Sequence, residues 1–452
     1  MSLGIARLVF ASLLVVYVVA GVWTTRRVNA TGDEPFYFMA TDALLHGEGL
    51  ELTERWRELP TASYDPGEAV PLSEFERSTA PSRARAGSYP LHDTGTSFVI
   101  ALPFAVGGRA LVSAFVALVM ATAVALGVLA ARASGAGPTT AAFAGLAVGL
   151  TAPALTYSGQ VFPDALAPLP LGIAVCALVG ALPRSTFGPA IAALPFLHLR
   201  FWPLALALLA VYVIVFRPGR REAGLVITPL VGVVLVLSLL GGVVYGVPIP
   251  HAGFLLFFTD RPEAHLAAFT RPTGEGLVGL FVDRAFGLLP AAPLMALLAF
   301  GVGAAARRSR LAPLMFSPIP YLMLVSFLDW TGGFSPQGRY FAVLTPVAVV
   351  LLALAFESRP ARLVAIPLGL WTLGQSLVYV AAPWLRYDFY GGAPLADMAW
   401  SRFVGLTPSA IFPLFGCCGT TTTLLAIAWS AVLLALVIVG AASRRPVTPA
   451  SH

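Results

Sequence analysis

The sequence predicts an all-α polytopic membrane protein with about twelve transmembrane helices and a long first extracytoplasmic loop. Two observations are compositional: 58% of the 452 residues are hydrophobic and 11% are charged, and the mean hydropathy is +0.82. A soluble chain of this length would be far less apolar. The third observation is the length of the apolar runs, about 17 to 22 residues, which suits spanning helices and lacks the period of two that a β-barrel requires.

The apolar runs define the expected helices in order along the chain. The first run is long for a cleaved signal peptide and more spans follow it, so we expect an uncleaved anchor. The segment 95–107, "GTSFVIALPFAVG", predicts an additional short re-entrant or interfacial helix, and "HLRFW" divides the fifth span from the sixth. The expected spans are 4–23, 108–131, 138–158, 163–182, 187–199, 201–216, 224–245, 286–305, 312–328, 339–356, 362–382 and 423–442.

Arginine sets the expected orientation. All 28 basic residues are arginine, scattered at the ends of apolar segments without the continuous basic face of a nucleic-acid-binding protein. If the N-terminus is cytoplasmic, the short outer loops contain little more than Arg200 and Arg339. The positive-inside rule then predicts an inner (plasma) membrane protein with both termini in the cytoplasm. The inner loops hold Arg7, Arg132, Arg184, Arg217, Arg220, Arg221, Arg307, Arg308, Arg310, Arg359, Arg362, Arg444 and Arg445.

The acidic residues lie on the opposite side. Of 22 Asp and Glu residues, only Glu222 and Glu357 fall in the expected cytoplasmic loops, so polar chemistry should face outward. The largest outer segment, residues 24–94, is too short for a stable core of its own and should pack on the membrane helices as a lid. We therefore expect one transmembrane domain over residues 1–452, without a separate soluble C-terminal domain.

The outer segment begins with a paired carboxylate in "GDEPFYFMATDALLHG". Asp33 or Glu34 should cap a helix with Pro35 in its first turn, where negative charge favours the helix dipole. Phe36 and Met39 then fall, with two alanines, on one face of an amphipathic helix at the membrane surface. Such a helix is also a rigid support for a carboxylate where a lipid headgroup meets water.

Four further outer segments carry polar groups at the ends of apolar helices: "SGQVFPDALAP", "FLHLRFW", "FVDRAFG" and "DWTGGFSPQGRYF". Ionisable groups so close to a span are costly, and each one alone is equally well explained by a structural ion pair. Their position on one common side of the membrane favours a functional role over a purely structural one. The candidate catalytic residues are Asp33, Glu34 and Asp164. The candidate substrate-binding residues are Tyr37, His92, Gln160, His198, Arg200, Asp283, Arg284, Trp330, Gln337, Arg339 and Tyr340.

These residue types suit a ligand that combines a phosphate, a sugar and a lipid tail. Arginine forks bind phosphate oxygens, and aromatic faces such as those of Trp202 and Trp330 stack on sugar rings. A carboxylate accepts the proton of an attacking hydroxyl. An apolar groove between helices would hold the lipid tail. The set predicts a lipid-phosphate-sugar transferase.

The N-terminal span followed by "GDEPFYFMATDALLHGEGL" resembles the first outer loop of the GT-C superfamily of membrane glycosyltransferases, in particular the protein O-mannosyltransferase and lipid A aminoarabinose transferase branch. In that family an acidic residue or pair begins the interfacial helix and a short polar signature closes it, as Gly47 and Glu48 do here. The motif covers about twenty residues. The segments "YPLHDTGTSFVIALPFAVGGR", "PFLHLRFWPL", "FVDRAFGLLPAAP" and "GGFSPQGRYF" also resemble recurring features of uncharacterised bacterial members.

The resemblance implies a GT-C-like fold, a polyprenyl-phosphate sugar donor, an inverting transfer and a catalytic carboxylate at Asp33. Asp164 stands where related enzymes often carry a second acidic residue. Two departures matter. We expect no large C-terminal soluble domain, which leaves the acceptor open among lipids, glycans and proteins. It also has no lysine, which moves phosphate binding to Arg200, Arg284 or Arg339.

Several alternatives stay open. No cofactor is expected, although Asp33, Glu34 and Asp164 would also suit an oxygen-rich divalent metal site. The three cysteines, of which Cys417 and Cys418 are adjacent, form neither a disulfide framework nor a metal-ligand spacing. A non-catalytic scaffold subunit of a membrane complex and a lipid or polysaccharide transporter are the competing functions. A transporter should carry charge near the bilayer midplane, whereas polar groups here gather at one surface.

Overall fold

The computed structural model describes residues 2–58, 71–260, 273–308, 311–328, 330–333, 335–386, 401–402, 405, 407–415 and 420–443. The cysteine pair Cys417 and Cys418 lies outside these residues. Within them the chain is helical apart from one two-stranded hairpin, which confirms the predicted all-α fold.

Among the described residues, six helical stretches are long and apolar enough to span a membrane, and four apolar ones are shorter. Every expected span contains helix, but several are interrupted. Pro163, Pro168 and Pro293 each stand in the first turn of a new helical segment, because proline cannot donate the hydrogen bond that would continue the preceding one. The long stretches are α1 (Ser2–Thr25), α5 (Gly95–Ala133), 199–216, 220–245, α21 (Arg359–Ala381) and α23 (Thr420–Ala442).

The bundle also contains the following helices, of which two make up most of the long stretches 199–216 and 220–245. They are α6 (Pro138–Gly149), α7 (Ala154–Tyr157), α8 (Pro163–Leu166), α9 (Pro168–Val179), α10 (Phe187–Leu197), α11 (Trp202–Phe216), α12 (Arg220–Leu240), α15 (Thr273–Val282), α16 (Leu288–Ala291), α17 (Leu297–Ala306), α18 (Ala312–Phe316), α19 (Ile319–Phe327) and α20 (Thr345–Phe356). A π-helical turn, η4 (Gly241–Tyr245), extends α12, and 3-10 turns include η3 (Leu199–Phe201), η5 (Pro293–Ala296) and η6 (Arg339–Phe341).

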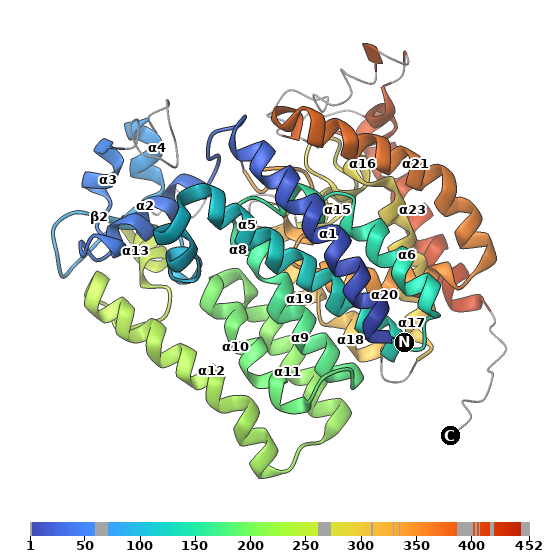
Figure 1. The fold of residues 1–452 in the computed structure, drawn as a ribbon, viewed down its shortest axis with the longest axis horizontal. Coiled ribbons are helices and arrows are strands. Elements are labelled where there is room, and N and C mark those ends of the chain that lie inside the picture. Colours follow the sequence, from blue (N-terminus) through green and yellow to red (C-terminus); the bar gives the residue numbers. More distant parts are fainter. Residues whose placement is uncertain are drawn as a thin grey trace.

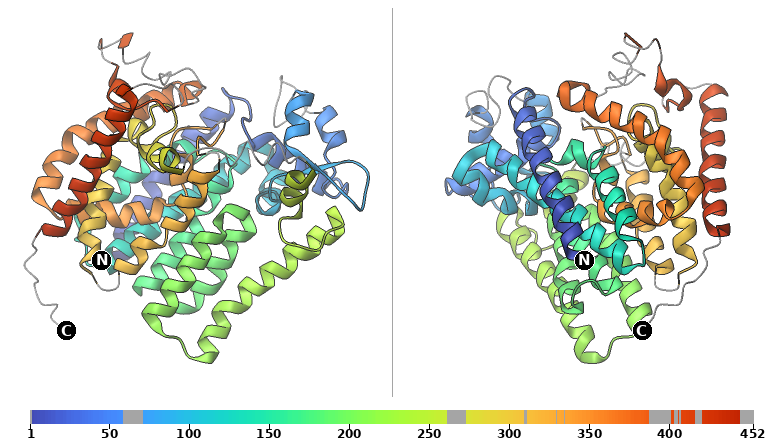
Figure 2. Two further views of the ribbon diagram at one scale, coloured as in Figure 1. Left: turned by 180° about the vertical axis from the view of Figure 1, so that it is seen from behind. Right: turned by 45° about the vertical axis from the view of Figure 1, so that its right-hand side comes forward.

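Helix α5 is the centre of the bundle and packs against α1, α6, α9 and α20 (Figures 1 and 2). Small residues allow these helices to approach closely, as is usual where the surrounding solvent is lipid. A Cβ atom at Gly127 of α5 would lie 2.8 Å from the Cβ of Val349 in α20, and one at Gly145 of α6 would lie 2.5 Å from Val128 of α5. The glycines therefore set the helix spacing on which the outer loops depend.

The expected division of α5 occurs at a pair of glycines. Gly107 and Gly108 have non-helical backbone angles, and Gly108 takes φ 56° and ψ −153°, a conformation that residues with a side chain rarely adopt. The segment before the kink is the predicted short helix of residues 95–107, and the segment after it is the predicted span.

The segment that the sequence predicts to lie outside the membrane precedes α5, and it is called the outer module for that reason. It comprises α2 (Glu34–Leu45), α3 (Thr53–Glu58), α4 (Leu72–Arg77), β1 (Thr79–Pro81) and β2 (Ser88–Pro90), with α13 (Ala252–Asp260) packed beside the hairpin (Figure 1). The strands are antiparallel, with Thr79 opposite Pro90. The hydroxyl of Tyr245, at the end of η4, donates to the carbonyl of Pro90 over 2.7 Å, so the module is tied to the end of a long membrane helix.

Helix α2 differs from the amphipathic surface helix expected from the sequence. Side chains on all its faces are buried, including Tyr37 and Phe38 as well as Phe36 and Met39. The hydroxyl of Thr41 donates to the backbone of Tyr37 and of Ser97 in α5, and the rings of Phe38 and Phe104 pack 5.7 Å apart. The first segment of α5 and the following loops cover the faces that an isolated helix would expose.

Candidate active site

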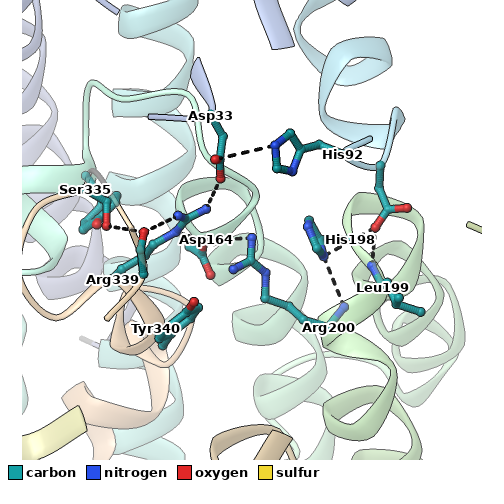
Figure 3. A network of polar contacts seen from close by, with 12 residues as sticks. Asp33, His92, Asp164, His198, Leu199, Arg200, Ser335, Arg339 and Tyr340 are labelled. Carbon is teal, nitrogen blue, oxygen red and sulfur yellow. Dashed lines mark hydrogen bonds and ion pairs between the residues drawn. The ribbon is translucent and has the colours of Figure 1, made fainter. Parts of the chain in front are cut away.

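Polar side chains from five separate segments of the chain converge in one cluster (Figure 3). Each comes from a helix end or a break between helices. Asp33 directly precedes α2, His92 follows β2, and Asp164 lies in the first turn of α8. Arg200 lies in η3, between α10 and α11, and Arg339 begins η6. The structure therefore brings together five of the predicted site residues.

Arg339 lies at the centre of this cluster. Its Nη2 donates to Oδ2 of Asp33 over 2.5 Å, and its Nε donates to Oδ2 of Asp164 over 3.1 Å. Nη1 donates to the backbone carbonyl of Gly332 over 2.7 Å, and the guanidinium carbon stacks 4.5 Å from the ring centre of Phe162. One buried guanidinium thus links both predicted catalytic aspartates, because its planar fork presents donors in several directions at once.

Arg200 supplies a second buried positive charge. Its Nη2 lies 3.6 Å from Oδ2 of Asp164, and its guanidinium carbon lies 5.5 Å from the ring centre of Tyr340. Nε of Arg200 and Oδ1 of Asp164 have no hydrogen-bond partner among the described residues. Two arginines and two aspartates therefore balance in charge, and two buried polar atoms among them are left without a partner in the part of the chain that is described.

Asp33 and His92 form the more open side of the cluster. Nε2 of His92 lies 3.6 Å from Oδ1 of Asp33, and their side chains are 19% and 22% exposed, against 7% for Arg339 and none for Asp164. Burial raises the pKa of Asp33, but Arg339 and then His92 more than offset this, and its net pKa lies well below the usual range. Burial lowers the pKa of His92, against the opposing effect of Asp33.

Glu34 does not join the cluster. Its Oε1 accepts from the backbone N–H of Val161 over 2.7 Å and its Oε2 accepts from that of Thr31 over 3.2 Å. Burial raises the pKa of Glu34 against the effects of Arg109 and the two amides. Glu34 therefore joins the start of α2 to the loop that leads into Asp164, and Gln160 is buried in that same loop.

The side chain of Asp33 stands at the N-cap of α2 but makes no capping hydrogen bond. Neither member of the acidic pair therefore caps the helix in the way the sequence suggested. The reason is tertiary: Arg339 attracts one carboxylate and the backbone of another loop binds the other.

Asp93 and His251 are part of the surroundings and were missed in the sequence. Asp93 Oδ2 accepts from the backbone N–H of Leu199 over 2.5 Å, and its Oδ1 lies 2.5 Å from Nδ1 of His251. Trp202 donates its indole N–H to Nε2 of His251 over 3.0 Å. The sequence feature that could have indicated Asp93 is its position, directly after His92 and just before a long apolar helix.

His198 belongs to the same surroundings. Its Nδ1 accepts from the backbone N–H of Arg200 over 3.2 Å and lies 3.4 Å from Oδ2 of Asp93 (Figure 3). It fixes the 3-10 turn that carries Arg200. Tyr37 lies on the other side of His92, with the two ring centres 5.9 Å apart, and its buried hydroxyl has no hydrogen-bond partner among the described residues.

Four other predicted residues are assembled in a different place, around the loop after α15. Asp283 accepts backbone N–H groups of Ala285, Phe286 and Phe415, and burial raises its pKa to about 6 against those three hydrogen bonds. Arg284 donates hydrogen bonds to the backbone carbonyls of residues 410 and 412. Trp330 packs edge-on to two phenylalanine rings. Gln337 accepts a hydrogen bond from the hydroxyl of Tyr379. These contacts join loops, and Gln337 in addition supports the turn that carries Arg339.

The carboxylates do not have the arrangement of a metal site in the part of the chain that is described. No group of three or more His, Cys, Asp or Glu side chains there is placed to hold an ion. Arg339 occupies the space between Asp33 and Asp164, and both oxygens of Glu34 accept amide hydrogen bonds.

An apolar cavity of about 390 Å³ begins next to η6. Phe341, the last residue of the η6 turn that Arg339 begins, is part of the lining. Other lining side chains come from α17, α19, α20 and α23, among them Val302, Ile319 and Leu434. A charged cluster and an apolar cavity are therefore adjacent.

Comparison with known proteins identifies one similar solved structure. No family model matches the chain, and no curated protein matches it. The chain is similar to the crystal structure of ArnT from Cupriavidus metallidurans in the apo state, with a TM-score of 0.47 and 16% sequence identity. The match covers 97% of this chain and 74% of that one. Similarity at this level does not assign an activity, so the function has to be argued from the site.

Proposed function

We propose that this protein is a membrane glycosyltransferase of the GT-C type, which moves a sugar from a polyprenyl-phosphate donor to an extracytoplasmic acceptor with inversion. The observation that carries the proposal is the buried cluster of Arg339, Arg200, Asp33 and Asp164 beside an apolar cavity. Its parts correspond to the three parts of such a donor. Guanidinium groups bind a phosphate, the cavity accepts part of a lipid tail, and carboxylates surround the sugar.

The donor phosphate would bind between the two arginines. Arg200 has an unpaired Nε, and Arg339 has donors that the phosphate would share with the carboxylates. Charge-assisted hydrogen bonds from arginine to phosphate are among the strongest available to a protein. As the bond between sugar and phosphate breaks, negative charge grows on the phosphate, and preorganised positive charge stabilises it most at that point.

Asp33 would act as the general base. Its bond to Arg339 keeps it ionised, but the same bond makes it a weak base in the free protein. A phosphate that shares Arg339 weakens that bond and raises the basicity of Asp33 when the donor is present. The acceptor oxygen then attacks the anomeric carbon, its proton passes to Asp33, and the bonding electrons of the broken bond stay on the phosphate oxygen.

Asp164 would support the positive charge that develops on the sugar, as carboxylates do in other glycosyl transfers. Its unpaired Oδ1 is available for that role. A phosphate is already a competent leaving group, so this reaction needs no general acid.

The proposal is tested by the transfer of radiolabelled sugar from a panel of polyprenyl-phosphate sugars in proteoliposomes. We expect transfer by the wild type and a loss of about a hundredfold or more in Asp33→Asn, the usual scale for a lost general base. The control is Asp42→Asn. Asp42 lies in α2, the helix that Asp33 precedes, and its carboxylate pairs with Arg55 and His46. Equal transfer by wild type and Asp33→Asn would exclude Asp33 as the base. No transfer by the wild type from any donor would favour the scaffold function.

A further inference from the structure

His92 is placed to receive a proton from Asp33. Its Nε2 faces Oδ1 of Asp33 at 3.6 Å, slightly longer than a hydrogen bond, and the two atoms need to approach by less than one ångström to share a proton. Contacts of this kind are often long in a free enzyme and shorten when substrate binds. His92 makes no hydrogen bond through Nδ1 among the described residues, so this nitrogen is available to pass a proton on.

Asp33 alone is poorly suited to keep a proton. Oδ2 is already bonded to Arg339, and the positive charge of the guanidinium favours the ionised carboxylate. A proton accepted on Oδ1 would therefore leave quickly if a better acceptor were near. The partly exposed imidazole of His92 is that acceptor, whereas Arg339 is always protonated.

We propose that His92 is the final acceptor of the proton that leaves the acceptor hydroxyl, with Asp33 as the intermediate carrier. The inference rests on the proposed transferase function and adds a second proton-handling residue to it. The hydroxyl oxygen bonds to the anomeric carbon, and its proton moves to Asp33 Oδ1 and then to His92 Nε2. The resulting imidazolium releases its Nδ1 proton to water, which leaves a neutral ring protonated at Nε2, and a change of tautomer then frees Nε2 for the next cycle.

The surroundings hold His92 in this position. The next residue, Asp93, is anchored by the backbone N–H of Leu199 and by His251. The rings of Phe36 and Tyr37 lie 6.1 and 5.9 Å from the imidazole, centre to centre. The strand end that carries His92 is therefore fixed on both sides, as a relay between two side chains requires.

The charges around His92 set the pH at which it can accept a proton. Burial, Arg339 and Arg200 disfavour the imidazolium, whereas Asp33 and Asp93 favour it, and the net pKa lies below the ordinary value. His92 is therefore neutral at neutral pH, and proton transfer to it should fail as the pH drops through its pKa. The titratable and charged groups that face it are Asp33, Tyr37, Asp93, His198, Arg200 and Arg339.

The first measurement does not need substrate. The chain has six histidines, so the imidazole nitrogens of ¹⁵N-histidine-labelled protein in detergent can be titrated by NMR, and His92→Gln identifies the signals of His92. We expect the pKa of His92 to fall further in Asp33→Asn, because the neighbouring negative charge is lost. An identical titration of His92 in wild type and Asp33→Asn would overturn the proposal, whether or not transfer is observed.

The second measurement is the pH profile of sugar transfer. Wild-type transfer should fall at acid pH, whereas His92→Gln should be slower by about tenfold to a hundredfold and should lose that acid fall. Added imidazole should restore part of the rate in His92→Ala. The control is His46→Gln, because His46 is exposed and bonds Asp42 in its own helix, and we expect it to retain the wild-type profile.

The outcomes separate the two proposals. A wild-type pH profile in His92→Gln would remove His92 from the reaction and leave the transferase function intact. Absence of transfer in the wild type, together with a coupled titration of His92 and Asp33, would count against the transferase function and the role of His92 in it, and would leave only the electrostatic coupling of the two side chains. Thermal unfolding of each variant in detergent shows whether a loss of rate reflects a loss of folded protein.

Discussion

Arg339 is the residue that allows two aspartates to lie close together in a buried site. Its guanidinium donates to both Asp33 and Asp164, and without it two like charges would face each other with Arg200 as the remaining arginine nearby. Breaking a buried ion pair costs about 3–5 kcal/mol, because the partner charge stays buried. Glu34 is stabilised differently, by two backbone N–H groups and by the charge of Arg109.

Glu34→Gln is expected to lower stability more than it lowers transfer. The two oxygens of Glu34 accept hydrogen bonds from the backbone N–H groups of Val161 and Thr31. Glutamine keeps one of these oxygens, but its NH₂ group would face the other N–H, so two donors would meet. A buried donor left without a partner costs about 1–3 kcal/mol. The decrease should appear in the thermal unfolding midpoint in detergent, while the transfer rate per folded molecule should stay within about threefold of wild type.

The matched control is Glu54→Gln, an exposed carboxylate paired with Arg57 within one helical turn. Surface pairs of this kind contribute little, so its unfolding should not change measurably. A hundredfold loss of transfer in Glu34→Gln with unchanged stability would instead assign Glu34 a catalytic role.

At the scale of elements, the site lies where helices end or break. Asp164 is in the first turn of α8, Arg200 is in the 3-10 turn between α10 and α11, and Arg339 begins the turn before α20. Irregular backbone is tolerated near a membrane only where protein or water satisfies its polar groups. Here side chains do so, since His198 accepts from the backbone N–H of Arg200 and Glu34 from that of Val161.

Gly108→Ala is expected to destabilise the protein by about 1–3 kcal/mol, because the kink of α5 requires a backbone conformation that alanine adopts only under strain. The kink joins the segment that packs on α2 to the segment at the centre of the bundle, so transfer should also decrease. Thermal unfolding in detergent measures the first effect and the transfer assay the second.

Gly224→Ala provides the comparison. Gly224 lies in helix α12 with open space where a Cβ would be, so alanine should be neutral or slightly stabilising there. Equal stability of the two variants would show that the kink conformation is not required.

At the scale of the whole molecule, the positions of the charged groups divide the protein into two ends. The predicted inner loops are rich in arginine, whereas α2 and the rest of the outer module lie toward the end away from the start of α1 (Figures 1 and 2). Asp33, at the start of α2, should therefore face the extracytoplasmic side, where a lipid-linked donor and an external acceptor would meet.

This orientation predicts the labelling of single cysteines by a membrane-impermeant maleimide on intact cells. With the native cysteines replaced by alanine, Ser73→Cys in the outer module should react without permeabilisation. Gly219→Cys, in the exposed turn before α12, should react only after the membrane is opened. The reverse pattern would contradict the arginine rule for this chain and would place the site in the cytoplasm.

Much of the fold could be predicted because hydropathy is a local property. Residues 4–23, 362–382 and 423–442 each form the long helix expected of them, and 95–107 forms the expected short one. Proline interruptions such as that at Pro163 were harder to judge, since a proline can either kink a helix or start a new one. Packing decides between these outcomes, and in α7, α8 and α9 it produces short helices that carry Asp164 into the site.

The sequence by itself determined the helical class, because composition and apolar run length act independently of distant residues. Only the tertiary structure decided which polar groups meet. Asp33 and Arg339 are 306 positions apart, and their contact depends on the packing of several helices between them. The same packing places Glu34 next to the backbone N–H of Val161 and buries side chains on all faces of α2. The neighbouring helices and loops determine which groups each of these side chains contacts.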